Sequence, residues 1–128
     1  MIISKTPYRI SFFGGGTDYP SWFKDHKGKI LSTTIDKFVY LTVRKLPPYF
    51  NYKHRVVWSK VENVNNFKEI QHNVVREMLK YYKIKNGLEI HYQGDLPART
   101  GMGSSSSFVV GLMNTLHCQK KIKISKFI

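Results

Sequence analysis

The sequence has few of the features that mark secreted or membrane-bound proteins. It holds one cysteine, Cys118, which excludes an internal disulfide and suits a reducing cytoplasm. No apolar run approaches the ~18 residues of a membrane span. The first residues, Met1 to Lys5, lead directly into a motif described below, so we expect no secretory peptide. These absences favour a globular cytoplasmic chain, and 128 residues allow one domain.

Acidic side chains are also scarce. Eight Asp and Glu residues stand against 21 Lys and Arg residues, which gives a formal net charge of +13. Such a charge attracts polyanions, but it does not distinguish nucleic acid from ATP or a sugar phosphate. The lysines are spread from Lys24 to Lys126 without forming one stripe, so nucleic-acid binding is the less favoured interpretation. The five histidines show no metal-ligand spacing.

The common phosphate-binding loops are missing as well, since neither Gly-x-x-x-x-Gly-Lys-Ser/Thr nor Gly-x-Gly-x-x-Gly occurs. What is present is Gly101-Met102-Gly103 followed by four serines, Ser104 to Ser107. This stretch lies between a strand-like segment, Leu88 to Tyr92, and an expected helix. A flexible linker is the alternative interpretation, but it would require ordered structure to stop abruptly. The helix is predicted by apolar residues at helical spacing, which we expect to be buried: Phe108, Val109, Leu112, Met113 and Leu116.

Two separated stretches resemble the signatures of a known family, the GHMP kinases. The first is Pro7 to Pro20, which reads Pro-Tyr-Arg-Ile-Ser-Phe-Phe-Gly-Gly-Gly-Thr-Asp-Tyr-Pro, and the second is Pro97 to Ser105. Three shorter segments are similar in sequence to the D-glycero-D-manno-heptose 7-phosphate kinases, namely Gly14 to Pro20, Leu31 to Lys37 and Gly94 to Arg99. The resemblance extends from residue 2 to about residue 117.

This resemblance implies an ATP-dependent sugar kinase. With Mg²⁺, the γ-phosphoryl group of ATP would pass to O1 of D-glycero-D-manno-heptose 7-phosphate and give the 1,7-bisphosphate. The implied fold is α+β, the ribosomal protein S5 domain 2-like N-terminal domain of GHMP kinases. We expect it over residues 1–128, incomplete at its C-terminal end and without the C-terminal GHMP domain.

Phosphoryl transfer depends on charge neutralisation and alignment more than on covalent help. Glycines let the backbone approach an anion closely, and a helix N-terminus adds unpaired N–H groups. The resemblance implies that the Ser105 hydroxyl reaches Mg²⁺. For the serines, simple helix capping is the alternative. The expected ATP-binding residues are Pro97, Gly101, Met102, Gly103, Ser104, Ser105 and Ser106.

The first motif supplies the catalytic and sugar-binding candidates. Arg9 precedes an apolar strand, Ile10 to Phe13, where a cation can extend from a rigid element. In the resembling kinases a basic residue here faces the transferred phosphoryl group or the acceptor oxygen, although a surface arginine is the alternative. Asp18, on a glycine turn, could accept hydrogen bonds from sugar hydroxyls or form an Asx turn. The expected substrate-binding residues are Gly15, Gly16, Thr17 and Asp18.

Local patterns predict the remaining elements. We expect a strand pair over Ile2 to Phe13 interrupted near Pro7, a short helix or turn over Ser21 to His26, and strands over Lys29 to Ile35 and Phe38 to Lys45 joined at Asp36-Lys37. Arg55 to Trp58 is expected to be a strand and Val61 to Phe67 a loop. A helix should begin at a capping Asn73, bury Val74, Val75, Met78, Leu79 and Tyr82, and stop at Gly87. Trp58 is more typical of a core residue than of an adenine pocket.

The resemblance also implies groups that this sequence does not contain. They are acidic residues downstream of the serine loop, an aspartate often proposed as base and a glutamate that helps hold magnesium. Three interpretations follow: an N-terminal portion with little activity alone, a catalytic half that works with a separate chain, or a basic module that binds nucleic acid. We favour the first. In each kinase interpretation the partners are ATP and a sugar phosphate, with no membrane.

Overall fold

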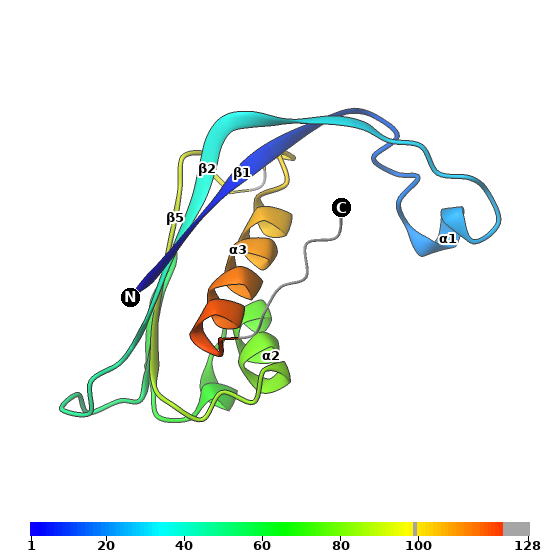
Figure 1. The fold of residues 1–128 in the computed structure, drawn as a ribbon. Helices are drawn as coiled ribbons and strands as arrows, with labels where there is room; N and C mark the ends of the chain where they lie inside the picture. The colour runs from blue at the N-terminus through cyan, green and yellow to red at the C-terminus, as the bar shows by residue number, and fades with distance from the viewer. Residues whose placement is uncertain (99, 122–128) are drawn as a thin grey trace.

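A five-stranded sheet with two longer helices on one face organises the chain (Figure 1). The computed structural model describes residues 1–98 and 100–121. The strands lie in the order β1-β2-β5-β3-β4, with β3 parallel to β5 and the other neighbours antiparallel. This is the expected α+β class. The elements are β1 (Ile2–Phe13), α1 (Pro20–Phe23), β2 (Leu31–Lys45), β3 (His54–Val57), β4 (Val61–Val64), the 3₁₀ helix η1 (Phe67–Glu69), α2 (Asn73–Tyr81), β5 (Leu88–Gly94) and α3 (Ser104–Gln119).

The core lies between this sheet and the helices α2 and α3. Alternate residues of a strand point to the same face, and Val39, Leu41 and Val43 of β2 are accordingly all fully buried. Helix α3 approaches β1 closely at Gly111, where an added Cβ would lie 2.9 Å from the hydroxyls of Ser4 and Thr6. The helices contribute Val75, Leu79, Phe108, Leu112 and Leu116 to the core, and β5 contributes Leu88 and Ile90.

Strands β1 and β2 are each continuous, so the predicted interruption near Pro7 and the predicted turn at Asp36-Lys37 are both wrong. Pro7 pairs with Phe38 and Arg9 pairs with Thr34, so β2 carries additional residues between these two pairs. The polar Asp36-Lys37 therefore belongs to an irregularity of the strand, which bends the ladder without ending it. Pro7 is tolerated because β1 is an edge strand, where one row of backbone groups has no neighbour in the sheet.

Three smaller expectations are also corrected, and one is confirmed. The segment predicted as a loop after Val61 forms β4 and η1. The N-cap of α2 is His72 instead of Asn73, because the His72 ring accepts a hydrogen bond from the Val75 N–H. Helix α2 ends at Tyr81, well before Gly87, and Lys83 follows with a φ of 48°. The short helix or turn predicted over Ser21 to His26 is confirmed as the single-turn helix α1.

The face of α3 opposite the sheet is less buried than its periodicity predicts. Phe108, Leu112 and Leu116 are buried as expected. Met113 keeps 37% of its surface exposed, and Val109 is only partly buried. On α2, Val75 and Leu79 are buried, whereas Val74 and Met78 are partly buried. The two helices therefore do not cover each other fully.

The far ends of β1 and β2 extend past the other strands and carry α1 (Figure 1). We call residues 12–31 the arm. At its base, Gly14 has a φ of 81°, and a Cβ there would lie 1.8 Å from the Lys29 carbonyl oxygen, so only glycine fits. The arm carries exposed apolar side chains, namely Phe12, Phe13, Tyr19, Trp22, Phe23, Ile30 and Leu31.

Candidate functional site

The two sequence motifs meet where β1 passes the loop before α3. The backbone N–H of Arg9 donates a hydrogen bond to the carbonyl of Met102, with 3.1 Å between nitrogen and oxygen. The Arg9 side chain lies against the same loop, because a Cβ added to Gly103 would be 2.9 Å from Arg9 Cγ. The Arg9 guanidinium also donates to the hydroxyl of Ser11. A cation from the first motif is thus held beside the phosphate-binding candidate of the second.

Glycine conformation shapes the loop. Gly101 and Gly103 both have a φ of 74°, in the left-handed region that ordinary side chains rarely adopt. Gly103 is the N-cap of α3, and no side chain caps this helix end. The alternative interpretation, that the serines cap the helix, is therefore wrong, and the first N–H groups of α3 have no side-chain acceptor within the part of the chain described here. A helix end of this kind favours an anion.

The four serines divide into two groups. Ser107 is buried, and its hydroxyl donates a 2.7 Å hydrogen bond to the carbonyl of Pro7, which attaches the first turn of α3 to β1. Ser104 is partly buried, while Ser105 and Ser106 are exposed. The exposed hydroxyls lie at the helix start where a ligand can reach them. Pro97 is exposed at the beginning of the loop.

A cleft of about 430 Å³ opens beside the start of α3. Ser104 and Ser105 line one side of it, and Trp58 and Ser59 of the β3–β4 turn line another. The space is thus bounded by hydroxyls and by aromatic rings from distant parts of the sequence. We call it the ring cleft, and it is lined by Trp58, Ser59, His72, Val74, Tyr92, Ala98, Ser104, Ser105 and Phe108.

The rings of this cleft pack on one another. The rings of Trp58 and His72 meet edge to face with 4.9 Å between centroids. The His72 ring in turn stacks on Phe108, also at 4.9 Å. Tyr92 meets Phe108 edge to face at 5.5 Å. Trp58 packs against the core, as predicted, and it also lines the cleft.

The ionisable rings in the cleft are held uncharged at neutral pH. Burial lowers the pKa of His72 below 6.5, although a hydrogen bond with its own backbone and the charge of Glu62 oppose the shift. Burial, together with a hydrogen bond to Tyr8, raises the pKa of Tyr92 to about 12. The ring cleft is therefore apolar and neutral on one side, and rich in hydroxyl and N–H donors on the other.

The sugar-binding candidates lie apart from this cleft. Gly15, Gly16 and Asp18 are exposed on the arm. The Thr17 hydroxyl accepts a hydrogen bond from the Lys29 N–H at 3.1 Å and lies 2.7 Å from the carbonyl oxygen of Gly14, so it closes the arm turn. Among the described residues no hydrogen bond joins these four positions to the loop before α3, and Figure 1 shows the arm extending away from it.

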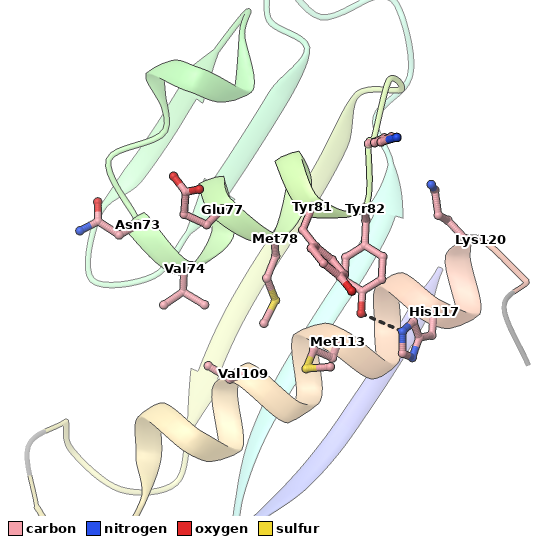
Figure 2. Close-up of a pocket in the computed structure, with 11 residues that line it drawn as sticks. Asn73, Val74, Glu77, Met78, Tyr81, Tyr82, Val109, Met113, His117 and Lys120 are labelled. Carbon is pink, nitrogen blue, oxygen red and sulfur yellow. Dashed lines mark hydrogen bonds between the residues drawn. The ribbon is translucent and has the colours of Figure 1, made fainter. Parts of the chain in front are cut away.

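A larger space, of about 1030 Å³, lies between α2 and α3, and we call it the side groove (Figure 2). Val74, Met78, Val109 and Met113 face it with apolar atoms. At one end the Tyr82 hydroxyl and His117 Nε2 are 2.7 Å apart. The groove lies along the facing sides of the two helices and begins at Asn73, the first residue of α2.

Magnesium is implied by the family resemblance, and the loop can be tested for it. No group of three or more His, Cys, Asp or Glu side chains gathers to hold a metal within residues 1–98 and 100–121. The Ser105 hydroxyl, exposed beside the ring cleft, is a hard oxygen of the kind Mg²⁺ accepts. It fits as one ligand of an ion that takes its other ligands from phosphates and water. No helix in that part of the chain is long and apolar enough to cross a membrane.

Fold and loop together define a class of protein, an α+β domain that presents a glycine–serine loop at a helix start. Comparison with known proteins shows which family the chain is similar to. The model of the GHMP kinases N terminal domain matches residues 67–126. The chain carries the fold of a GHMP kinase N-terminal domain, as the resemblance in sequence predicted.

Two curated relatives are sugar kinases. The chain is 26% identical to the D-glycero-alpha-D-manno-heptose 7-phosphate kinase of Campylobacter jejuni over 88% of this chain and 36% of that protein. It is 27% identical to the galactokinase of Pyrococcus furiosus over 91% of this chain and 33% of that protein. The chain thus spans about a third of the length of these relatives.

Solved structures share the fold. A D-glycero-D-manno-heptose 1-phosphate kinase from Bacteroides thetaiotaomicron superposes with a TM-score of 0.80 at 20% identity, covering 98% of this chain and 44% of that one. The mevalonate kinase of Methanococcus jannaschii gives a TM-score of 0.69 at 19% identity, covering 97% and 42%. The architecture around the loop is therefore common to kinases of different small molecules.

Several cleft residues were not among the candidates from sequence. His72 and Tyr92 lie outside both sequence motifs, and Phe108 was expected only in the core. Glu62, which holds Trp58 and His72, lies in a segment predicted to be a loop. A weak signal was present, since Glu62-Asn63 lies between Val61 and Val64, and a glutamate is unusual in a short strand that packs on a core.

Proposed function

We propose that this chain supplies the ATP-binding half of a sugar kinase that phosphorylates D-glycero-D-manno-heptose 7-phosphate at O1. The observation that carries the proposal is the contact of Arg9 with the loop of Gly101 to Gly103, which unites the two motifs at the N-terminus of α3. The heptose substrate is supported by the sequences of both motifs and by the names of the heptose phosphate kinases among the similar proteins.

In this proposal the ATP phosphates bind the loop and the first turn of α3. Backbone N–H groups after Gly103 and the hydroxyls of Ser104 to Ser106 donate hydrogen bonds to them, and the positive φ angles of the glycines keep the backbone open to an anion. Pro97 and Met102 shape the same loop. The nucleotide base enters the ring cleft, whose neutral aromatic walls suit a flat heterocycle.

Arg9 is proposed to neutralise charge on the transferred phosphoryl group. Its backbone is fixed by Met102, and its guanidinium is oriented by Ser11, so little reorganisation is needed when charge develops. Ser105 would hold Mg²⁺, which supplies positive charge to the phosphate oxygens when bound. Gly15, Gly16, Thr17 and Asp18 are proposed to contact the sugar from the arm, and the reaction is placed in the cytoplasm.

The test has a binding arm and a turnover arm. Calorimetry with ATP and Mg²⁺ should show binding to the chain, and phosphate transfer should be measured with heptose 7-phosphate, galactose and mevalonate as acceptors. Arg9→Gln should reduce turnover by ~100-fold. Lys80→Gln is the matched control, because Lys80 lies exposed on α2 and changes the charge equally. Absence of ATP binding would contradict the proposal, and preference for galactose would contradict the heptose assignment.

A further inference from the structure

Glu62 occupies an unusual place next to the ring cleft. It is the buried residue of β4, with 8% of its surface exposed, at a position where an apolar side chain is the usual occupant. Among the ion pairs within residues 1–98 and 100–121, none involves Glu62. A buried carboxylate without a counter-charge is stable only if hydrogen bonds replace its lost hydration.

Three N–H donors meet this carboxylate. Trp58 Nε1 donates to Oε1 at 2.8 Å, and the backbone N–H of His72 donates to the same oxygen at 3.2 Å. The backbone N–H of Gln71 donates to Oε2. One side chain therefore joins the β3–β4 turn to the residues that begin α2.

Two of these donors belong to residues that line the ring cleft. Trp58 and His72 meet edge to face, and His72 stacks on Phe108. The hydrogen bond from the indole to Glu62 fixes the rotation of Trp58, while the backbone bond fixes the residue that caps α2. The Trp58 ring cannot turn without breaking its bond to Glu62, whereas the His72 ring is held by the cap bond that Nδ1 accepts from the Val75 N–H.

The geometry points to Glu62 as a positioning residue that holds Trp58 and His72 as the two walls of the base pocket. This inference rests on the proposed function, because it concerns the part of the site that receives the nucleotide base. Glu62 itself does not line the cleft, and it acts through the Trp58 ring and the His72 backbone. Its role is specific to the base, since the phosphates would bind on the opposite side at Ser104 and Ser105.

Substitution of Glu62 by glutamine removes the negative charge of the side chain and keeps its size. An amide has one acceptor oxygen, and its NH₂ group would face N–H donors, so Glu62→Gln leaves at least one donor unpaired. We expect ATP to bind about tenfold more weakly, as follows from the loss of one buried hydrogen bond to a charged group. Inorganic tripolyphosphate, which has no base, should bind the variant as well as it binds the wild-type chain.

Glu69→Gln is the matched control. Glu69 lies seven residues further along the chain, is exposed, and accepts only the Asn66 N–H at 3.5 Å. The Glu69→Gln variant has the same change in charge, but Glu69 has no bond to the cleft walls. The affinity of this variant for ATP should therefore equal that of the wild-type chain. Calorimetry on the full chain measures both ligands, and thermal unfolding reports whether each variant folds.

Trp58→Phe keeps the proposal falsifiable if Glu62→Gln does not fold. This variant keeps a ring and removes the bond to Glu62, so it should weaken ATP binding and leave tripolyphosphate binding unchanged. In the Trp58→Phe background, Glu62→Gln should weaken ATP binding much less than it does in the wild-type chain, because part of its effect passes through the indole.

Three outcomes would overturn the inference. They are equal loss of ATP and tripolyphosphate affinity in Glu62→Gln, unchanged ATP affinity in that variant, and fully additive effects with Trp58→Phe. If the wild-type chain binds tripolyphosphate but not ATP, the base pocket is absent and the inference fails while the anion site stands. If the wild-type chain binds neither ligand, the proposed function fails first.

Discussion

Gly103 shows how one residue can join backbone conformation to ligand chemistry. Its φ of 74° lets the chain enter α3 with the first N–H groups open to an anion. Its missing side chain leaves room for Arg9, whose Cγ would lie 2.9 Å from a Cβ at this position. A methyl group at this position would therefore both strain the loop and displace the Arg9 side chain.

Gly103→Ala should destabilise the chain more than Gly101→Ala does. Both residues have a φ of 74°, which costs a non-glycine residue roughly 1–2 kcal/mol. Only Gly103 also faces a neighbour, because nothing lies within 4 Å of a Cβ at Gly101. Urea unfolding of the two variants measures the difference, and ATP affinity should fall further in Gly103→Ala. Equal loss of stability and affinity would show that Arg9 does not press on the loop.

At the scale of elements, helix α2 contributes its first residues to the wall of the ring cleft and later ones to the core. Its N-cap, His72, stacks on Phe108 of α3 and meets Trp58 after β3, so the start of this helix is part of the ring cleft. The cap bond runs from the Val75 N–H to His72 Nδ1 at 3.4 Å. A neutral imidazole is needed for this bond, since a protonated ring has no acceptor nitrogen.

The stability of the chain should fall as the pH drops from 7 to 5. Burial lowers the folded-state pKa of His72 below 6.5. Burial, together with the charge of Lys53, does the same for His54. A group with a lowered folded-state pKa stabilises the fold above its unfolded value, and this contribution is lost as the pH falls through the folded one. Urea unfolding at the two pH values should show the decrease.

His72→Asn should flatten this dependence and keep the helix cap, because asparagine is a good N-cap and does not titrate here. The remaining slope should come from His54. His72→Ala removes ring and cap together, and it should cost about 1 kcal/mol more than His72→Asn at pH 7. A slope between pH 7 and 5 that is the same in His72→Asn and wild type would contradict the assignment.

Regular periodicity made α2, α3, β3 and β5 predictable from sequence. Their apolar residues recur at the spacing of one buried face, as Phe108, Leu112 and Leu116 illustrate. The continuity of β2 was not predictable, because Asp36-Lys37 reads as a turn unless the register with β1 is known. The cap at His72 was missed for a similar reason, since asparagine is the more usual cap and the ring's acceptor role depends on its tautomer.

The candidate site was predictable only where it is continuous in sequence. The glycine–serine loop was found because its residues are adjacent, and Arg9 was found through the family resemblance. The walls of the ring cleft come from β3, α2, β5 and α3, and only packing brings them together. Glu62 was hidden for this reason, as its three partners are recognisable only in space.

At the scale of the whole molecule, apolar surface is unusually exposed in two places. The arm presents Phe13 with 72% and Tyr19 with 65% of the surface exposed, and the side groove leaves apolar atoms of α2 and α3 uncovered. Solvent-facing apolar patches of this kind commonly mark surfaces that other protein covers. The edge strand β1 adds a row of backbone groups that can pair with another strand.

The isolated chain should therefore self-associate in solution. Sedimentation velocity over a range of concentrations should show species larger than a 15.0 kDa monomer, increasing with concentration. The double variant Phe13→Ser, Phe23→Ser should reduce the association, because both rings lie on the arm. Tyr49→Ser is the matched control, since Tyr49 is 76% exposed but lies outside the arm, and it should leave the association unchanged. A monomer at every concentration, with sharp and reversible unfolding, would show that the arm and groove are tolerated in water without a covering partner.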